Sequence, residues 1–455
     1  MAAQPTAHRI GLKFLKRTSA HPTAYRLRSV LTGNIYEDTG WTLDPPGEPA
    51  PSLIRAEYSQ KQITLKGTQT GLYQFADWLP FHQYLEGSSA PLTYKSSELA
   101  SVLGLKNLWI TFSGYWPAKG IRMSTCSFKE LEAYSVCSRL GSHPGRILVV
   151  ASAGNTARAF ARVCSDNGIP LLLCVPEDNV DTLWSDRPFS PSVRLICTAS
   201  GSDYFDAIAL SNVAASLAGF LAEGGAKNIA RRDGMGTTVL SAVTTMGRIP
   251  DYYFQAVGSG TGAIAAWEAN LRLLADGRFG HKKMRLMVSQ NEPFTPMYDA
   301  WRAGSRDLLP LDDDVARHQV EQIFSKVLSN RKPPYAIAGG LYDALSDTQG
   351  DILKVSNTSA IAAAELFGET EGVDIHPAAA VALASLMQAI TNQRIDPEAD
   401  IMLNITGGGE HLFRKTHHLY YLRPDHIFNV GASRDEVADV LKLLFRQELQ
   451  GIKIS

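Results

Sequence analysis

Short apolar runs recur through the middle and C-terminal parts of the chain, and each ends at a segment rich in turn-forming residues. Continuous apolar runs of this length are typical of strands that are covered on both faces, as in parallel sheets. The runs that we predict as strands are residues 146–152, 170–178, 192–200, 252–258, 284–290 and 400–409.

Between these runs, apolar residues recur at helical spacing. Helical patterns follow the runs at 146–152, 192–200 and 252–258, and residues 376–390 read as a buried helix. The sequence Ser-Arg-Asp-Glu at 433–436 is a capping box that predicts the start of a last helix. Strands that alternate with helices of ten or more residues predict an α/β fold built on parallel sheets.

The N-terminal region has a weaker pattern. Residues 1–60 are poor in periodicity and contain the turn-rich stretch "DPPGEPAPS" at 44–52. The first residues are basic but lack a continuous apolar core and a clear cleavage site. We expect a loose cytoplasmic N-terminus.

Composition narrows the class of protein. The chain has 455 residues, 45% of them hydrophobic and 20% charged, with a net charge of −1. This balance fits a globular protein of two or three domains and gives no reason to expect a nucleic-acid or membrane partner. The five cysteines are odd in number and form no Cys-x-x-Cys pair, so they predict a reducing compartment and neither disulfides nor a zinc site.

Ligands in parallel sheets collect at the carboxyl ends of the strands, so the glycine-rich exits are the places to look for chemistry. The exit "VGSGTGA" at 257–263 follows a predicted strand and opens a predicted helix, which suits a phosphate. A tight turn is the plain alternative. The spacing G-x-G-x-G also departs from the dinucleotide fingerprint, and no Lys-Ser/Thr pair marks a P-loop.

Two further exits offer polar groups. "ASAGNTARAF" at 151–160 can present backbone N–H groups and one amide to a carboxylate or a ring hydroxyl, or can serve simply as a helix cap. "NITGGG" at 404–409 places the Thr406 hydroxyl at the end of the last strand, where a strand-terminating turn is the alternative.

Lys129 lies in "STCSFKELEAY" at 124–134, at the predicted start of a helix that precedes all three exits. A solvated surface lysine is the commoner case. A lysine that forms a Schiff base, however, needs a desolvated pocket and fixed donors for cofactor and substrate, which the three exits would supply.

The motifs "SFKE", "SAGNT", "GSGTG" and "TGGG" occur in the order found in fold type II pyridoxal-phosphate enzymes, and the chain resembles this group over residues 70–425. The resemblance to tryptophan synthase β and threonine synthase implies two open parallel-sheet domains with the cofactor in the cleft. Residues 71–131 and 237–455 would form the large domain, and residues 132–236 the small mobile one. Residues 1–70 would be an N-terminal extension.

The resemblance also implies residue roles. Lys129 would hold pyridoxal phosphate and shuttle the Cα proton, and Asn155 would bind the ring oxygen. Thr406 would meet the ring nitrogen as a neutral hydroxyl, which favours loss of a β-substituent over transamination. The cofactor phosphate would be held by Gly258, Ser259, Gly260, Thr261 and Gly262, and the substrate carboxylate by Ser152, Ala153, Gly154, Asn155 and Thr156.

The phosphate of the substrate needs cationic or hydroxyl partners. Ser124, Thr125 and Arg158 are candidates by position, and Arg122 is a further one. A structural ion pair or a helix cap is the alternative for each.

Within the group, residues 55–80 and 108–133 resemble the cysteate synthase family. The implied reaction converts O-phospho-L-serine and sulfite to L-cysteate and phosphate, in a homo-oligomer (dimer or trimer) that binds small molecules. The alternatives are a threonine synthase-like reaction with another phosphorylated amino acid or nucleophile, and a binding module without cofactor. A nicotinamide enzyme fits less well, because Glu292 follows the glycine loop at too long a spacing.

Two features depart from relatives of the group. The ribbon-like N-terminal segment has no cysteine, so we expect no metal. Cys126 stands where a glycine is common in relatives, and would be either a small buried residue or a group that narrows the leaving-group pocket.

Overall fold

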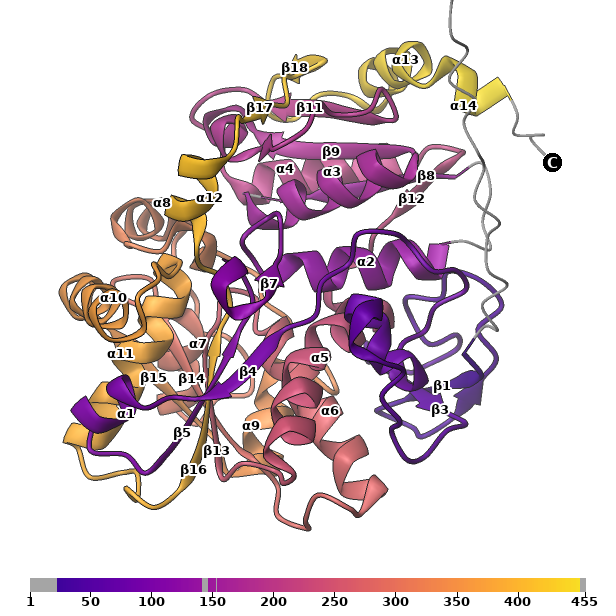
Figure 1. Ribbon diagram of the computed structural model, residues 1–455. Coiled ribbons are helices and arrows are strands. Elements are labelled where there is room, and N and C mark those ends of the chain that lie inside the picture. Colours follow the sequence, from indigo (N-terminus) through magenta and orange to yellow (C-terminus); the bar gives the residue numbers. More distant parts are fainter. Residues whose placement is uncertain (1–22, 141–145, 153, 451–455) are drawn as a thin grey trace, which may run out of the picture.

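The structure is a computed structural model that describes residues 23–140, 146–152 and 154–450. Its largest sheet has the strand order β15-β14-β13-β16-β5-β4 (Figure 1). β4 runs antiparallel to β5, and the other four pairs are parallel. The strands are β4 (Leu92–Lys95), β5 (Asn107–Phe112), β13 (Tyr252–Ala256), β14 (Arg285–Asn291), β15 (Asp351–Val355) and β16 (Asp400–Ile405).

Helices cover both faces of this sheet, and its central strands are therefore buried almost throughout. In Figure 1, α5 (Ile229–Met246) and α6 (Thr261–Asp276) lie on one side, and α10 (Asn357–Glu371) and α11 (Pro377–Thr391) on the other. The predicted buried helix at 376–390 corresponds to α11. Shorter helices complete this part, namely α1 (Glu98–Val102), α7 (Pro296–Arg302), α8 (Asp313–Gln322), α9 (Leu341–Thr348) and α12 (Glu410–Thr416).

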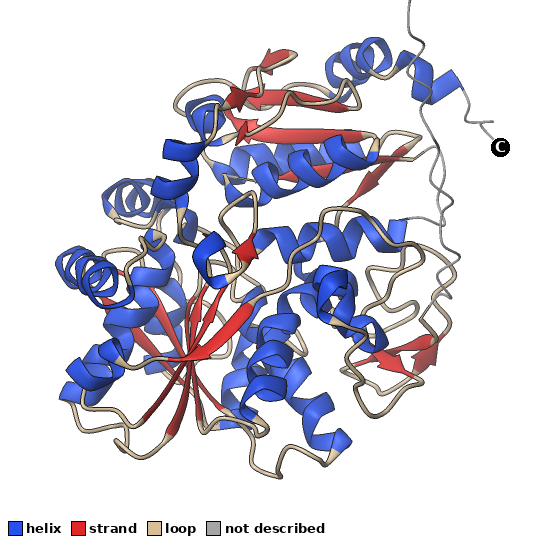
Figure 2. Cartoon of the chain, in the orientation of Figure 1, coloured by secondary structure: helices blue, strands red, loops and turns tan. Residues whose placement is uncertain are grey.

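The second sheet is fully parallel and has the order β12-β8-β9-β11-β18 (Figure 2). Its strands are β8 (Ile147–Ala151), β9 (Leu171–Pro176), β11 (Val193–Thr198), β12 (Phe220–Ala222) and β18 (His426–Phe428). α3 (Asn155–Asn167) and α4 (Tyr204–Ala215) pack on it, and α13 (Arg434–Leu444) packs on α4. Ser433 caps α13 by accepting a hydrogen bond from the backbone of Glu436, at the predicted capping box.

The second sheet includes a strand from the C-terminal part of the chain, which we expected to belong to the large domain. β18 pairs with β11 in the second sheet, whereas we expected residues 237–455 to belong wholly with the larger sheet. A returning C-terminal strand of this kind leaves no mark in the local pattern, and the division of the chain into a large domain and a small mobile domain over residues 132–236 stays a proposal.

α2 (Lys129–Arg139) lies between the two sheets and packs against α3 and α5 (Figure 1). Ten of its residues are buried, among them Glu130 and Glu132, so this helix is no solvated surface element. Its position brings its first residue, Lys129, to the region where both sheets end.

The N-terminal segment forms a three-stranded antiparallel sheet, β2-β1-β3, which the sequence analysis did not predict. Its strands are β1 (Tyr25–Ser29), β2 (Ile35–Tyr36) and β3 (Ile54–Tyr58). Buried and half-buried residues alternate along β3. In the described part of the chain, no helix is both long and apolar enough to cross a membrane.

Candidate active site

The catalytic candidate Lys129 opens α2, and its side chain is 21% exposed. Its Nζ lies 3.3 Å from Oε2 of Glu132, one helical turn further along. Burial lowers the pKa of Lys129, although the charge of Glu132 acts in the opposite direction. A lowered pKa makes the neutral, nucleophilic amine more accessible, which is what a Schiff-base lysine requires.

Glu132 is a second residue of the site that the sequence analysis missed. Its carboxylate is fully buried and accepts a hydrogen bond from the Thr156 hydroxyl at 3.0 Å. Arg231 lies 3.3 Å from the same carboxylate and also pairs with Glu223. The three-residue spacing from Lys129 could have revealed this contact, because such residues lie side by side on a helix.

A cavity lies at this meeting point of the two sheets. It is lined by Ser127, Phe128, Lys129, Ser152, Gly154, Asn155, Thr156, Tyr204, Ala256, Val327, Leu328, His376, Ala378 and Thr406. The structure therefore brings together Lys129, Thr406 and four members of the predicted carboxylate loop, while Ala153 lies outside the described residues.

Backbone hydrogen bonds hold the lysine loop against the turn that carries Thr406. The Phe128 N–H donates to the Thr406 carbonyl at 2.9 Å, and the Gly408 N–H donates to the Cys126 carbonyl at 3.1 Å. Cys126 is fully buried, does not line the cavity, and has a left-handed φ of +54°. This conformation is costly for residues other than glycine, so glycine is the residue that this backbone would favour there.

Asn155 is the first residue of α3, and its amide is fixed by Arg158. Nη2 of Arg158 donates to Oδ1 of Asn155 at 3.0 Å, so the amide nitrogen of Asn155 is the group left to face a ligand. Gly154, just before it, donates its N–H to the Ser152 hydroxyl at 3.0 Å. These two hydrogen bonds hold Gly154 and Asn155 in place at the start of α3.

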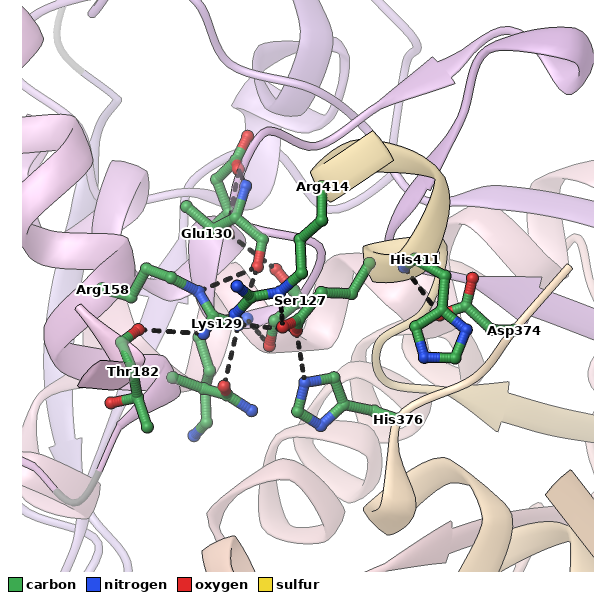
Figure 3. Close-up of polar contacts among 12 residues, drawn as sticks. Ser127, Lys129, Glu130, Arg158, Thr182, Asp374, His376, His411 and Arg414 are labelled. Carbon is green, nitrogen blue, oxygen red and sulfur yellow. Dashed lines mark hydrogen bonds and ion pairs between the residues drawn. The ribbon is translucent and has the colours of Figure 1, made fainter. Parts of the chain in front are cut away.

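Arg158 itself does not line the cavity, contrary to the role in substrate binding that we expected. Its guanidinium is 3% exposed and donates to the carbonyls of Thr125 and Thr182 (Figure 3). It also lies over the Trp184 ring, with 4.2 Å to the centroid. Because its donors are taken up by the protein, Arg158 is placed to position Asn155 and not to receive phosphate.

Ser124 and Thr125 also lie outside the cavity lining. The Thr125 hydroxyl and backbone N–H each donate to Oε2 of Glu130 at 3.0 Å, and the Ser124 hydroxyl lies 3.5 Å from the same oxygen. Burial raises the pKa of Glu130 to about 7, against these hydrogen bonds. Both hydroxyls therefore shape the loop before Lys129, which was the structural alternative for them.

The predicted phosphate loop, Gly258–Gly262, follows β13 and leads into α6. A Cβ atom at Gly258 would lie 2.8 Å from the Val327 carbonyl, and one at Gly262 would lie 2.5 Å from Nε2 of Gln255. At Gly258 only glycine fits, because a side chain would meet this backbone carbonyl, whereas at Gly262 the Gln255 side chain would have to move. The Thr261 N–H donates to the Ser259 hydroxyl at 3.3 Å. Ser259 and Thr261 line an adjoining cavity of about 540 Å³, which shares Tyr204 with the first.

His376 and Glu410 complete the site, and neither was predicted. His376 lines the cavity, and its Nε2 lies 3.3 Å from Oε2 of Glu410 (Figure 3). Arg158 and Arg414 also pair with Glu410, at 3.7 and 2.7 Å. Although burial opposes ionisation, the hydrogen bond from His376 and the charge of Arg158 hold the pKa of Glu410 at about 2.

The set of donors fits pyridoxal phosphate. A half-buried lysine of lowered pKa suits its aldehyde, and a glycine-rich loop at the start of the long helix α6 suits its phosphate. The Asn155 amide and the Thr406 hydroxyl suit the polar atoms of its ring. The chemistry of these residues matches that cofactor.

Comparison with known proteins agrees with this reading. Residues 120–407 match the family model described as pyridoxal-phosphate dependent enzyme. The chain is 50% identical to a cysteate synthase of Methanocella paludicola over 399 residues, which are 87% of this chain and 92% of the relative. It is 48% identical to a cysteate synthase of Methanosarcina barkeri over 374 residues, 82% of this chain and 90% of the relative.

Among solved structures, maize serine racemase is similar in fold, with a TM-score of 0.53. It is 16% identical in sequence, and the match covers 71% of this chain and 91% of that one.

Proposed function

The chain belongs to the pyridoxal-phosphate-dependent enzymes and, within them, to the cysteate synthase family, and we propose that it converts O-phospho-L-serine and sulfite to L-cysteate and phosphate. The observation that carries the proposal is the cavity that Lys129, Asn155, Thr406 and the Ser152–Thr156 loop share. A non-enzymatic binding module would have no need of a half-buried lysine held against a carboxylate.

In this proposal Lys129, Asn155, Thr406 and the Gly258–Gly262 loop hold the cofactor. When bound, pyridoxal phosphate supplies the electron sink that makes the Cα–H bond of the substrate acidic. Lys129 then accepts and carries the Cα proton on Nζ, which Glu132 holds in place at 3.3 Å.

The Ser152–Thr156 loop binds the substrate carboxylate through its backbone N–H groups and the Asn155 amide. Thr156 is tied to Glu132, so the carboxylate loop and the catalytic lysine are held by one buried residue. The apolar side chains of Phe128, Val327 and Leu328 line the same cavity and exclude water from the reacting atoms.

The test is a product assay. The cofactor-loaded protein is incubated with O-phospho-L-serine and sulfite, phosphate is measured by colour reaction, and L-cysteate by mass spectrometry. We expect cysteate and phosphate in equal amounts, both dependent on protein. Release of phosphate from O-phospho-L-homoserine instead, with threonine as product, would favour the threonine synthase-like alternative. Turnover of neither substrate would contradict the proposal.

We also propose that the enzyme is a homo-oligomer. Supporting this, Ile427, Val430 and Leu443 are 43%, 58% and 78% exposed in and beyond the edge strand β18. Exposed apolar residues near a sheet edge favour association. Light scattering should then give a mass that is a multiple of 49.6 kDa, and a monomer mass would contradict it.

We also propose a cytoplasmic location, on the basis of the cysteines. All five cysteines are buried and unpaired, and the Sγ atoms of Cys137 and Cys164 lie 3.6 Å apart without a bond. Free cysteines are typical of proteins in a reducing compartment. Cell fractionation would test the proposal, and recovery of the protein outside the cytoplasm would contradict it.

A further inference from the structure

His376 is an ionisable residue of the cavity to which the mechanism above assigns no task. Among the described residues that line the cavity, the ionisable ones are Lys129, Tyr204 and His376. His376 precedes the first turn of α11, yet its imidazole does not cap that helix. Its side chain is 17% exposed, so it is neither a surface residue nor a simple helix cap.

The ring of His376 is held in one orientation. Its Nε2 lies 3.3 Å from Oε2 of Glu410, as Figure 3 shows. Its Cδ2 edge faces Gly407, where a Cβ atom would come within 3.3 Å of Cδ2. None of the residues that the structure describes makes a hydrogen bond to Nδ1, so Nδ1 is the nitrogen available to a ligand.

Glu410 determines which nitrogen of His376 is engaged within the protein. Arg158 and Arg414 pair with this carboxylate, and its pKa of about 2 keeps it ionised at neutral pH. An ionised carboxylate accepts a hydrogen bond and cannot donate one, so Nε2 keeps its proton. The nitrogen of His376 that is left to exchange a proton with a ligand is therefore Nδ1.

The departing phosphate needs such a proton. When the Cβ–O bond of phosphoserine breaks, its electron pair stays on the oxygen, and an unprotonated phosphate dianion would leave as a strongly basic trianion. One proton delivered to that oxygen gives hydrogen phosphate instead. Lys129 is occupied with the Cα proton, and burial raises the pKa of Tyr204, which makes its phenol a weaker donor.

We propose that His376, oriented by Glu410, is the general acid that donates its Nδ1 proton to the leaving oxygen of the phosphate group. The Cβ–O electron pair goes to the oxygen, the imidazole becomes neutral, and solvent returns its proton before the next turnover. This role rests on the proposed function, since it assumes a phosphate leaving group.

The test compares two leaving groups in His376→Gln. O-phospho-L-serine needs a proton on departure, whereas β-chloro-L-alanine loses chloride, which needs none. With sulfite present, we expect kcat for phosphoserine to fall by about 10²–10⁴-fold, and kcat for chloroalanine to stay within about threefold of the wild type. Visible absorbance of bound pyridoxal phosphate shows that the variant is loaded.

Tyr204→Phe is the matched variant, because Tyr204 is the competing proton donor in the cavity. Equal losses with both substrates in His376→Gln would overturn the proposal, as would a rise in KM for phosphoserine without a loss of kcat. A leaving-group difference in Tyr204→Phe but not in His376→Gln would assign the proton to Tyr204. If the wild type itself releases no phosphate from phosphoserine, the proposed function fails instead.

Discussion

The two sides of the cavity each set an ionisable group against a carboxylate, but they do so by different means. On the lysine side, Lys129 and Glu132 belong to one helix, and helical spacing alone brings them together. On the histidine side, His376 and Glu410 lie at the starts of α11 and α12. There, the contact depends on the glycine turn, because the His376 N–H donates to the Gly407 carbonyl at 2.9 Å.

The two sides also differ in what determines the pKa of their ionisable groups. Burial dominates on the lysine side and lowers the pKa of Lys129 in spite of its carboxylate neighbour. On the histidine side, hydrogen bonds and the charge of Arg158 overcome burial and hold Glu410 ionised. The lysine side therefore favours the neutral amine of Lys129. The histidine side keeps Glu410 ionised, so that this carboxylate can orient the imidazole of His376.

The largest expected effect is on the histidine side. The pKa of Glu410, about 2 in the folded protein, lies below the value of about 4.3 for a free glutamate. A depressed carboxylate pKa stabilises the fold above the unfolded value and loses that contribution as the pH falls toward the folded value. We therefore expect Glu410→Gln to lower the free energy of unfolding by about 3 kcal/mol at pH 7 and by about half as much at pH 3.

Urea unfolding at the two pH values measures this difference. Glu321→Gln is the matched control, because Glu321 is 76% exposed, and it should change stability little at either pH. The same loss for Glu410→Gln at both pH values would show that the carboxylate does not act through its charge.

A smaller effect is expected on the lysine side. Glu132→Gln keeps the shape of the side chain but removes the charge that favours the ammonium form of Lys129. The pKa of Lys129 should then fall further, which raises the share of neutral amine. We expect protein freed of its cofactor to take up pyridoxal phosphate severalfold faster at pH 7, followed by visible absorbance. Slower uptake would mean that Glu132 matters mainly for holding Nζ in position.

Much of the fold could be predicted because its main strands are continuous apolar runs. β8, β9, β11, β13 and β16 lie within predicted strands, and β14 extends one residue beyond its predicted strand. β3 could also have been predicted, because apolar and charged residues alternate in its sequence Ile-Arg-Ala-Glu-Tyr, as its burial does in the structure. β18 could not be predicted from the sequence, because this three-residue strand is defined by its pairing with the distant strand β11.

The residues of the site likewise differ in whether a local motif marks them. The strand exits and Lys129 carry local motifs, and the structure places Lys129, Asn155 and Thr406 on one cavity. Arg158, Ser124 and Thr125 have suitable chemistry and position in the sequence, but their polar atoms are engaged by other parts of the protein. His376 and Glu410 could not be paired from the sequence, because only the tertiary structure brings their helices together.

The central claim is that Lys129 carries the cofactor, and chemical trapping tests it most directly. Borohydride reduction of the loaded protein fixes pyridoxal phosphate to the amine that holds it, and peptide mapping by mass spectrometry then identifies that residue. We predict the label on Lys129, in stoichiometric amount, and none in Lys129→Ala. A label on another lysine of the wild-type protein, or none at all, would contradict the account.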